Sequence, residues 1–549
     1  MHPNLYELSF LLLHLYFAAF ICTTGASSPS LFDGNLELPG GSIPSVSLEH
    51  LDPTLPPALP TQTPHCSQVV LQHDFADTVG PKPASANYTH PSDCPFPWTR
   101  VVLELSVAAT DLQESRVAAI WIDGAEVLRT VTPIPMARGA FWRVHKDVTR
   151  YTALLRRLAD GGGVISMMLE NSNKVLPGVF SANVSLHYFR GPVDDSGSKS
   201  MSNAAHLPLD PFTAIPRTSS SPSPSPTGNM DPDFGTPTAA KVSAPRANGA
   251  FRKVYATIDG KYVGGHVPFP VIYSSAINPV FWAPVASIGA FDMPSYDLDL
   301  TPFLALMLDG QPHEIGLGVC SALPHWLVNA NLHLWVDYWS DAVQAGPVEY
   351  FVPAIQMNRN AEWRNPDGQS EIGAEGLERF AGWVSSSRGN LTTEVRHKIK
   401  VKSQVQVQNR GAVTQIDFIL KERTMVTVMR GNQWLARAQT VMDAPLQVQT
   451  AIVNAAGVPV LQKTRFFHQL MEAVSLSEGQ AGSTTTRELT DRQDAEGSAV
   501  VGGGWGSGRS RSSYQYRDGS KCYARNVATA GGAVIQDRKA SCFAVADDA

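Results

Sequence analysis

Residues 117–131 read Val-Ala-Ala-Ile-Trp-Ile-Asp-Gly-Ala-Glu-Val-Leu-Arg-Thr-Val, and this stretch decides the fold class. Its first six residues are almost continuously apolar, which is typical of a strand covered on both faces. The Asp123-Gly124 pair that follows favours the two-residue turn whose twist matches a β-hairpin. We therefore expect residues 125–131 to return as the second strand of an antiparallel hairpin.

Similar strand signals occur on both sides of this hairpin. Residues 101–107 alternate apolar and polar side chains, and residues 254–265 contain a second Asp-Gly hairpin. Residues 348–475 alternate over longer runs, which fits long antiparallel strands with one solvated face. With 43 Gly, 40 Pro and only 17% charged residues, the composition favours turn-rich β-structure over helix bundles. The sequence therefore predicts an all-β protein.

One internal repeat predicts two β-sandwiches of related topology. A segment that starts at Asp147 matches one that starts at Asp299, and each is followed by a Gly-containing turn, an apolar strand and a closing strand. The closing strands begin at Ala182 and Ala330. Because the matches occur in the same order, we expect two tandem jelly-roll-like β-sandwiches followed by a further antiparallel β-region.

Composition divides the chain into eight segments. The segment at 191–250, rich in Ser, Pro, Thr, Asn and Gly, cannot bury enough apolar area to fold and is interpreted as a linker or an exposed insertion, and the segment at 476–513 is of low complexity, rich in Gly, Ser and Thr. The expected order is a signal peptide (1–26), a Pro-rich lead (27–65), the first sandwich (66–190), a low-complexity linker (191–250), the second sandwich (251–345), a C-terminal β-region (346–475), a low-complexity segment (476–513) and a Cys-containing tail (514–549).

The first 26 residues predict entry into the secretory pathway. Residues 10–22 form an apolar run of signal-peptide length, followed by small residues. No Lys or Arg precedes the run, so a retained membrane anchor is the alternative, and membrane contact is expected only in that case. Three Asn-x-Ser/Thr sequons fit this route, at Asn87, Asn390 and, within an expected strand, Asn183. We expect a secreted, extracellular or lumenal secretory or vacuolar protein.

The cysteines and the net charge exclude several classes of site. The five cysteines that remain after removal of a signal peptide show no CxxC spacing suited to zinc or redox chemistry. Pairing within short local segments gives disulfides Cys66–Cys94 and Cys522–Cys542 and leaves Cys320 unpaired. The net charge of -6 is spread along the chain, so nucleic acid is not expected as a partner.

Five segments, taken together, resemble the peptide:N-glycanase A family. They are CPFPW (94–98), IWIDGAEVLR (120–129), KDVTRY (146–151), GAFDMPSYD (289–297) and NANLHLW (329–335). The resemblance implies a glycoamidase that hydrolyses the amide between asparagine and N-acetylglucosamine in N-glycopeptides or unfolded glycoproteins. Related enzymes need neither a metal nor an organic cofactor, so neither is expected here. Such chemistry requires carboxylates beside cationic groups in a sugar-binding cleft.

Part of the site of the related bacterial glycoamidases, which are also built from two jelly rolls, can be placed on this chain. Those enzymes carry an Asp-Arg pair where this chain reads Ser115-Arg116. Because a serine cannot replace the carboxylate base, Glu114 or Asp123 would have to do so. The supporting Glu of those enzymes corresponds to Glu170. The resemblance therefore implies the catalytic candidates Glu170, Arg116, Asp123 and Glu114.

Each of these residues also has a structural interpretation. Glu170 is typical of a solvated strand end, Arg116 of an inter-strand ion pair, and Asp123 of a turn that requires positive φ. No acid from the second sandwich is assigned, because Ala283 stands where one would be expected.

Sugar rings stack on indole faces, which makes some tryptophans glycan-binding candidates, although a tryptophan in a β-sandwich is more often a core residue. Trp282 and Trp326 are favoured because neighbouring Pro or His residues suggest loops, and Trp121 is the third candidate. Two alternatives to an amidase remain. A non-catalytic glycan-binding or cell-wall interaction protein of the same fold is favoured by Ser115 and Ala283, and a glycosidase would use two carboxylates.

Overall fold

The structure is a computed structural model of the whole chain. It describes residues 8–18, 48–57, 63–80, 82–89, 91–111, 113–134, 139–158, 162–172, 176, 178–190, 206–208, 251–274, 276–320, 327–337, 339–340, 342–364, 366–455, 458–479, 482, 484–500, 506–519 and 521–540. These residues form three β-structures, two sandwiches and one long sheet, so the predicted all-β class is confirmed. Among them, no helix is long and apolar enough to cross a membrane.

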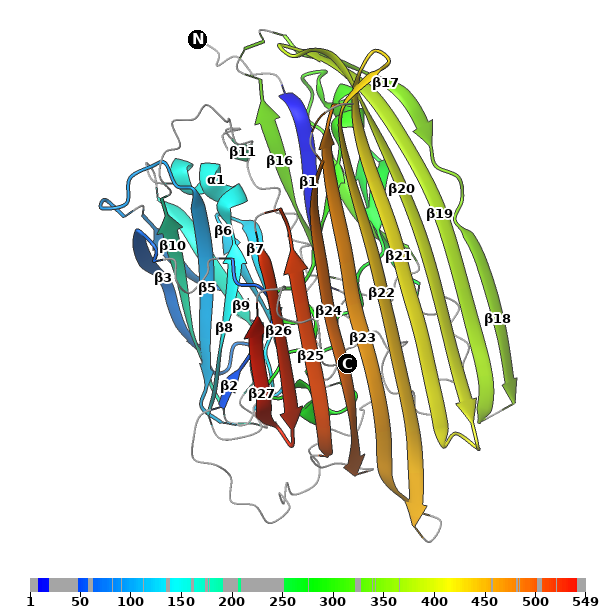
Figure 1. The fold of residues 1–549 in the computed structure, drawn as a ribbon. Coiled ribbons are helices and arrows are strands. Elements are labelled where there is room, and N and C mark those ends of the chain that lie inside the picture. Colours follow the sequence, from blue (N-terminus) through cyan, green and yellow to red (C-terminus); the bar gives the residue numbers. More distant parts are fainter. Residues whose placement is uncertain are drawn as a thin grey trace.

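The first sandwich contains the β-hairpin of residues 117–131 (Figure 1). Asp123, at φ 47°, forms the turn of this hairpin, as expected for an Asp-Gly pair. One sheet has the order β2 (Leu48–His50), β8 (Ala140–Asp147), β5 (Arg100–Ala109), β10 (Phe180–Phe189), β3 (Cys66–Phe75). The other has the order β4 (Ala84–Tyr88), β9 (Gly163–Leu169), β6 (Val117–Ile122), β7 (Ala125–Val131). Ile120, Leu128 and Trp142 contribute to the core between them.

The second sandwich is smaller and repeats part of this topology. Its sheets are β13 (Lys261–His266), β12 (Lys253–Ile258), β15 (Ile315–Cys320), and β11 (His206–Pro208), β16 (Leu327–Val336), β1 (Leu8–Ala18), β14 (Ser295–Asp299). In the first sandwich β8 and β10 flank β5, and in the second the matching strands β14 and β16 flank β1. Removal of residues 1–26 stays a prediction, and in this structure Leu8–Ala18 occupy the position that corresponds to β5.

A short helical turn follows the matching strand in each sandwich. In the first sandwich a 3-10 helix (Thr149–Tyr151) leads into α1 (Thr152–Arg157), and in the second a 3-10 helix covers Thr301–Met307. Asp147 and Asp299 each accept a hydrogen bond at 2.9 Å from the backbone N–H two residues later. The two aspartates of the internal repeat therefore stabilise turns.

The C-terminal part forms one eleven-stranded antiparallel sheet beside the sandwiches (Figure 1). Its strands are β17 (Gln344–Phe351), β18 (Gln356–Arg364), β19 (Asp367–Ser386), β20 (Gly389–Gln408), β21 (Val413–Arg430), β22 (Gln433–Ala455), β23 (Val458–Glu478), β24 (Thr484–Val500), β25 (Ser507–Arg517), β26 (Cys522–Ala530) and β27 (Ala533–Ala540). Along β20 the side chains alternate between buried and exposed, as predicted for a strand with one solvated face. Residues between β13 and β14, including Phe269 and Ile288, pack on the buried face against Phe418 and Leu446.

The low-complexity segment at 476–513 forms part of the long sheet. Strands β24 and β25 lie there, and β26 and β27 continue the sheet into the predicted tail. The glycines allow close packing, because a Cβ on Gly497 or Gly508 would lie 2.9 or 3.0 Å from the Phe281 ring. The hydroxyl groups pair across strands, as in Ser510 with Thr529 at 2.7 Å. A composition that resembles a linker is here the composition of a closely covered sheet.

Two other segments, the Pro-rich lead and the linker at 191–250, each contain a short strand. Within the Pro-rich lead, residues 48–57 are ordered: β2 pairs with β8, and Leu51 N–H donates to Pro284 O at 2.7 Å. Apart from β11, the linker at 191–250 lies outside the described residues.

The disulfide Cys66–Cys94 is confirmed, and it joins the start of β3 to the loop after β4. Cys522 is disulfide-bonded, and Cys542 lies outside the described residues. Cys320 is free and exposed, as predicted.

Candidate functional site

Four of the five segments quoted above meet where the two sandwiches touch. Glu126 of β7 is fully buried, and its carboxylate accepts hydrogen bonds from Arg129 Nε and Nη2 at 2.6 and 2.7 Å. Asn329 of β16 in the second sandwich donates to the same carboxylate at 2.9 Å. The Glu126–Arg129 pair is therefore held from both sandwiches.

Further contacts extend this junction. Asn331 Nδ2 donates to the backbone oxygen of Glu126 at 2.7 Å and to the Tyr151 hydroxyl at 3.1 Å. At its margin, Lys146 pairs with Asp292 at 2.7 Å, and Arg150 with Asp297 at 3.2 Å. The segments that carry the family resemblance thus fix one sandwich against the other.

Sequence reasoning missed Glu126, although it lies inside a quoted segment. The available signal was a charged residue within an otherwise apolar strand, three positions before Arg129. A buried carboxylate is rarely found without a cationic partner, so the pair was open to prediction.

Three of the four catalytic candidates come together at one end of the β4-β9-β6-β7 sheet. Arg116 directly precedes β6 and Glu170 directly follows β9, and these strands are antiparallel with Ala118 opposite Leu169. Glu170 consequently comes opposite Val117, next to Arg116. Arg116 Nη2 lies 3.1 Å from Glu114 Oε2. The structure brings Glu114, Arg116 and Glu170 into one group.

Burial differs within this group. Arg116 is 5% exposed, whereas Glu114 and Glu170 are half-buried. Burial lowers the pKa of the Arg116 guanidinium from its ordinary value, and the negative charges of Glu114 and Glu170 oppose that change. The guanidinium stays cationic because its ordinary pKa is far above neutrality. The result is a buried cation between two carboxylates that water can reach.

Ser115 is committed to a structural hydrogen bond. Its side chain is buried, and its hydroxyl donates to Thr132 O at 2.9 Å. Thr132 Oγ1 in turn accepts from Arg116 N–H at 2.8 Å. The neighbouring Val131 N–H donates to Ala290 O at 2.7 Å, so the group lies close to the 289–297 segment of the second sandwich. Ala283 is buried and supplies no acid.

Asp123 does not join this group. It follows β6 while Arg116 precedes it, and the rise of about 3.3 Å per residue places the two about 20 Å apart. The Asp123 carboxylate lies 3.6 Å from Arg157 at a partly exposed turn. In this structure Asp123 serves the hairpin turn.

The tryptophan candidates have different positions. Trp282 is 2% exposed, donates from Nε1 to Ala276 O at 2.8 Å and packs edge-on against Phe466 of the long sheet. Trp282 lies outside the strands, in a 3-10 helix (Pro279–Trp282) between β13 and β14, and its indole is covered by the long sheet. Trp121 is half-buried on β6, and Trp326 lies outside the described residues. Asn87, Asn183 and Asn390, the sequon residues, are exposed.

Comparisons with known proteins agree with the family resemblance of the five segments. The family model described as Peptide N-acetyl-beta-D-glucosaminyl asparaginase amidase A matches residues 53–226 and 228–352, which include all five quoted segments. The peptide-N4-(N-acetyl-beta-glucosaminyl)asparagine amidase A of Prunus dulcis is 28% identical over 539 residues, covering 89% of this chain and 92% of that protein. No solved structure matches the chain.

Proposed function

Because the chain belongs to the peptide N-acetyl-beta-D-glucosaminyl asparaginase amidase A family, we propose that it hydrolyses the amide between asparagine and N-acetylglucosamine in N-glycopeptides. The observation that supports this activity most is the arrangement of Glu114 and Glu170 around Arg116, beside the contact of the two sandwiches. It combines a fixed cation with two carboxylates that are open to water.

In the proposed reaction, Glu170 accepts a proton from a water molecule whose oxygen attacks the side-chain amide carbon. Negative charge then develops on the amide oxygen, and Arg116 stabilises it by hydrogen bonds from a site that is largely closed to bulk water. The C–N bond breaks as Glu170 returns the proton to the leaving nitrogen, which gives aspartate and a glycosylamine. Glu114, 3.1 Å from Arg116, holds the guanidinium in position, and the step uses no metal.

The same geometry supports glycopeptides and unfolded glycoproteins as substrates. Arg116 is 5% exposed, so the scissile amide must reach below the surface of the first sandwich. An asparagine on a flexible chain can do so, whereas one on a compactly folded surface is held away by its neighbours.

A secretory-pathway location is part of the proposal. The Cys66–Cys94 disulfide supports it, because such bonds persist in oxidising compartments. The exposed sequon residues Asn87 and Asn390 and the apolar run at residues 10–22 agree with it.

One observation favours a second function, a glycan-binding protein without amidase activity. Ser115 occupies the position where related bacterial enzymes carry an aspartate, and its hydroxyl is already bonded to Thr132 O. If that carboxylate is indispensable, the chain retains the family's sandwiches and binds glycan without cleaving it.

Purified full-length chain incubated with a dye-labelled N-glycopeptide separates the candidates. Mass spectrometry showing an aspartyl peptide and release of the whole glycan supports the amidase. Saturable binding of the labelled peptide without any conversion supports the glycan-binding protein. A peptide that keeps its innermost N-acetylglucosamine indicates a glycosidase and contradicts the proposal.

A further inference from the structure

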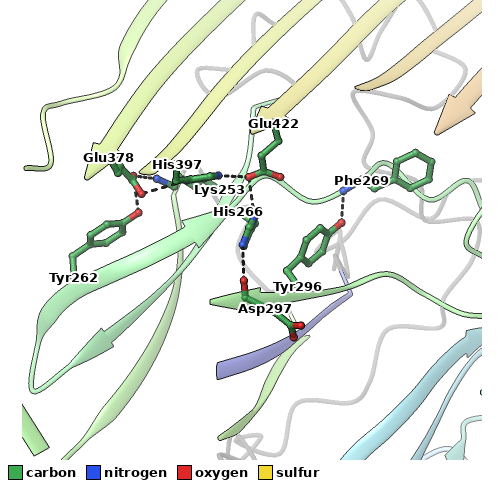
Figure 2. A network of polar contacts seen from close by, with 9 residues as sticks. All are labelled: Lys253, Tyr262, His266, Phe269, Tyr296, Asp297, Glu378, His397 and Glu422. Atoms are coloured by element: carbon green, nitrogen blue, oxygen red, sulfur yellow. Dashed lines mark hydrogen bonds and ion pairs between the residues drawn. The ribbon is translucent and has the colours of Figure 1, made fainter. Parts of the chain in front are cut away.

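A second polar cluster joins the second sandwich to the long sheet (Figure 2). Its residues come from β12 and β13 on one side and from β19, β20 and β21 on the other: Lys253, Tyr262, His266, Glu378, His397 and Glu422. None of them belongs to the Glu114–Arg116–Glu170 group. The proposed amidase mechanism leaves this cluster without a role.

Three potential metal ligands converge at the centre of the cluster. His266 Nδ1 lies 2.9 Å and His397 Nε2 lies 2.5 Å from the same oxygen, Oε1 of Glu422. All three ligand atoms lie within 4.8 Å of one another, and the exposed fractions of the three residues are 8%, 6% and 6%. Figure 2 shows both rings directed toward the Glu422 carboxylate.

The other nitrogen of each ring has its own acceptor. His266 Nε2 lies 3.3 Å from the backbone oxygen of Asp297, and a carbonyl oxygen can only accept. His397 Nδ1 lies 3.5 Å from Glu378 Oε2. Each outer nitrogen therefore has an acceptor for an N–H, and each inner nitrogen faces the Glu422 carboxylate. This arrangement, with a carbonyl or carboxylate behind each histidine, is the one that usually supports metal-ligating histidines.

Glu378 is itself anchored. Its Oε1 accepts hydrogen bonds from Lys253 Nζ and, at 2.7 Å, from the Tyr262 hydroxyl. Lys253 and Glu378 neutralise each other, so they add no net charge beside the three converging atoms. The histidine orientation is thus fixed by residues from both β-structures.

Two inner ring nitrogens face one carboxylate oxygen in this buried site, so positive charge must lie among the three atoms. Two additional protons would supply it, but the resulting imidazolium rings, with centroids 5.0 Å apart, would repel each other where little water screens them. One divalent cation supplies the same charge and binds all three atoms directly. Two imidazoles and one carboxylate form a ligand set that suits Zn²⁺.

We propose that His266, His397 and Glu422 bind one structural Zn²⁺ that fastens the second sandwich to the long sheet. Zinc–ligand distances of about 2.0–2.2 Å require ligand atoms within about 4 Å of one another, and two of the three separations already meet that limit. The second oxygen of Glu422 or a water molecule completes the coordination. Because the ligands come from β13, β20 and β21, the ion stabilises the contact between these elements and is independent of the proposed amidase function.

The first experiment uses the wild-type full-length chain. After treatment with EDTA, the protein is dialysed against a buffer containing ZnCl₂ and then against metal-free buffer, and bound zinc is measured by plasma mass spectrometry. We expect one tightly held zinc per chain and a higher unfolding temperature than for the EDTA-treated protein. Absence of retained zinc, or unfolding temperatures that coincide, would overturn the proposal and leave two protons as the charge at this site.

The second experiment locates the ion. His397→Gln and Glu422→Gln should lose the bound zinc and the zinc-dependent shift in unfolding temperature. His145→Gln is the matched control, because His145, Glu104 and His187 form a more exposed group of the same residue types on the first sandwich, with His145 Nε2 3.1 Å from Glu104 Oε2. The control should keep its zinc. Zinc retained by His397→Gln, or lost by His145→Gln, would contradict the assignment.

A third readout does not depend on the stability of the variants. Co²⁺ bound in place of Zn²⁺ should give the visible absorption of a four-coordinate ion in the wild type. A Co²⁺ spectrum typical of the six-coordinate aqueous ion would refute a three-residue protein site.

Discussion

The first sandwich contains two Glu–Arg groups that differ in how deeply their carboxylates are buried. Glu126 is fully buried, and both of its carboxylate oxygens accept from Arg129, with Asn329 as a further donor. Glu114 and Glu170 are half-buried around Arg116 and remain open to water. A carboxylate with every oxygen engaged stabilises the fold, whereas one that keeps access to water can accept and return a proton. The comparison supports a structural role for the first group and the proposed catalytic role for the second.

The largest effect on stability is expected at the buried Glu126–Arg129 pair. Glu126→Gln removes one charge and leaves Arg129 buried without compensation, which should lower the free energy of unfolding by about 3–5 kcal/mol. Urea denaturation measures the change. Glu371→Gln, which removes a carboxylate that pairs with Lys402 on the exposed face of the long sheet, is the control and should stay within about 0.5 kcal/mol of the wild type. Equal effects of the two variants would break the comparison.

The next effect is on catalysis. Glu170→Gln removes the proposed proton acceptor while keeping the shape of the side chain, and should lower kcat on an N-glycopeptide about 100-fold or more. Because Glu170 is half-buried, the substitution should change the protein's free energy of unfolding only a little. Turnover by mass spectrometry and urea denaturation are measured on the same preparation. Unchanged turnover would remove Glu170 from the mechanism.

A substitution at position 115 is expected to raise the amidase turnover. Ser115→Asp places a carboxylate beside Arg116, as the proposed correspondence with the bacterial glycoamidases implies, and should raise turnover about 10-fold or more. The hydrogen bond to Thr132 O is lost, so a stability cost of about 1 kcal/mol accompanies the gain. Ser115→Ala carries the same loss without the carboxylate and is the control. A gain shared by both variants would show that charge is not its cause.

Only part of the fold could be predicted from the sequence. The hairpin of residues 117–131 and the internal repeat were predictable, because apolar runs, an Asp-Gly turn and paired aspartates act locally. The strands after residue 476 were not, since two of their glycines, Gly497 and Gly508, pack against Phe281, which lies more than 200 residues earlier. The position of Trp282 outside the strands fits its neighbouring prolines, but its burial depends on Phe466, which is distant in sequence.

The candidate site was predictable only in part. Arg116 and Glu170 came from a resemblance, and their proximity depends on the register between β6 and β9, which no local pattern determines. Glu126 was visible as a charge in an apolar strand, whereas its partner Asn329 belongs to the other sandwich. The His266, His397 and Glu422 cluster has no sequence spacing that would reveal it, because three strands from two β-structures supply it.

The smallest effect is expected at Asp491, a buried carboxyl group on β24 of the long sheet. Burial, and then the charge of Asp52, raise the pKa of Asp491 to about 8. Since its unfolded value is about 4, the stability that protonated Asp491 contributes is present below about pH 4 and is lost as the pH rises through about 8. Asp491→Asn stays neutral, so at about pH 9 it should be about 1 kcal/mol or more stable than the wild type, with little difference at about pH 4.

Urea denaturation at both pH values measures this effect. The control is Asp494→Asn on the same strand, whose exposed carboxylate pairs with Arg492 at 2.7 Å and should not change the pH dependence. If wild type and Asp491→Asn lose stability in parallel as the pH rises, Asp491 is already charged in the folded protein.

Isotope labelling tests most directly whether the water-accessible carboxylates perform amide hydrolysis. Wild-type chain is incubated with an N-glycopeptide in H₂¹⁸O, and the peptide product is sequenced by mass spectrometry. Water attack on the side-chain amide predicts an aspartate at the former glycosylation site with one ¹⁸O in its carboxylate, and a Glu170→Gln preparation should form far less of it. An asparagine that still carries its full glycan after prolonged incubation, or an ¹⁸O label found only on released sugar, would contradict the account.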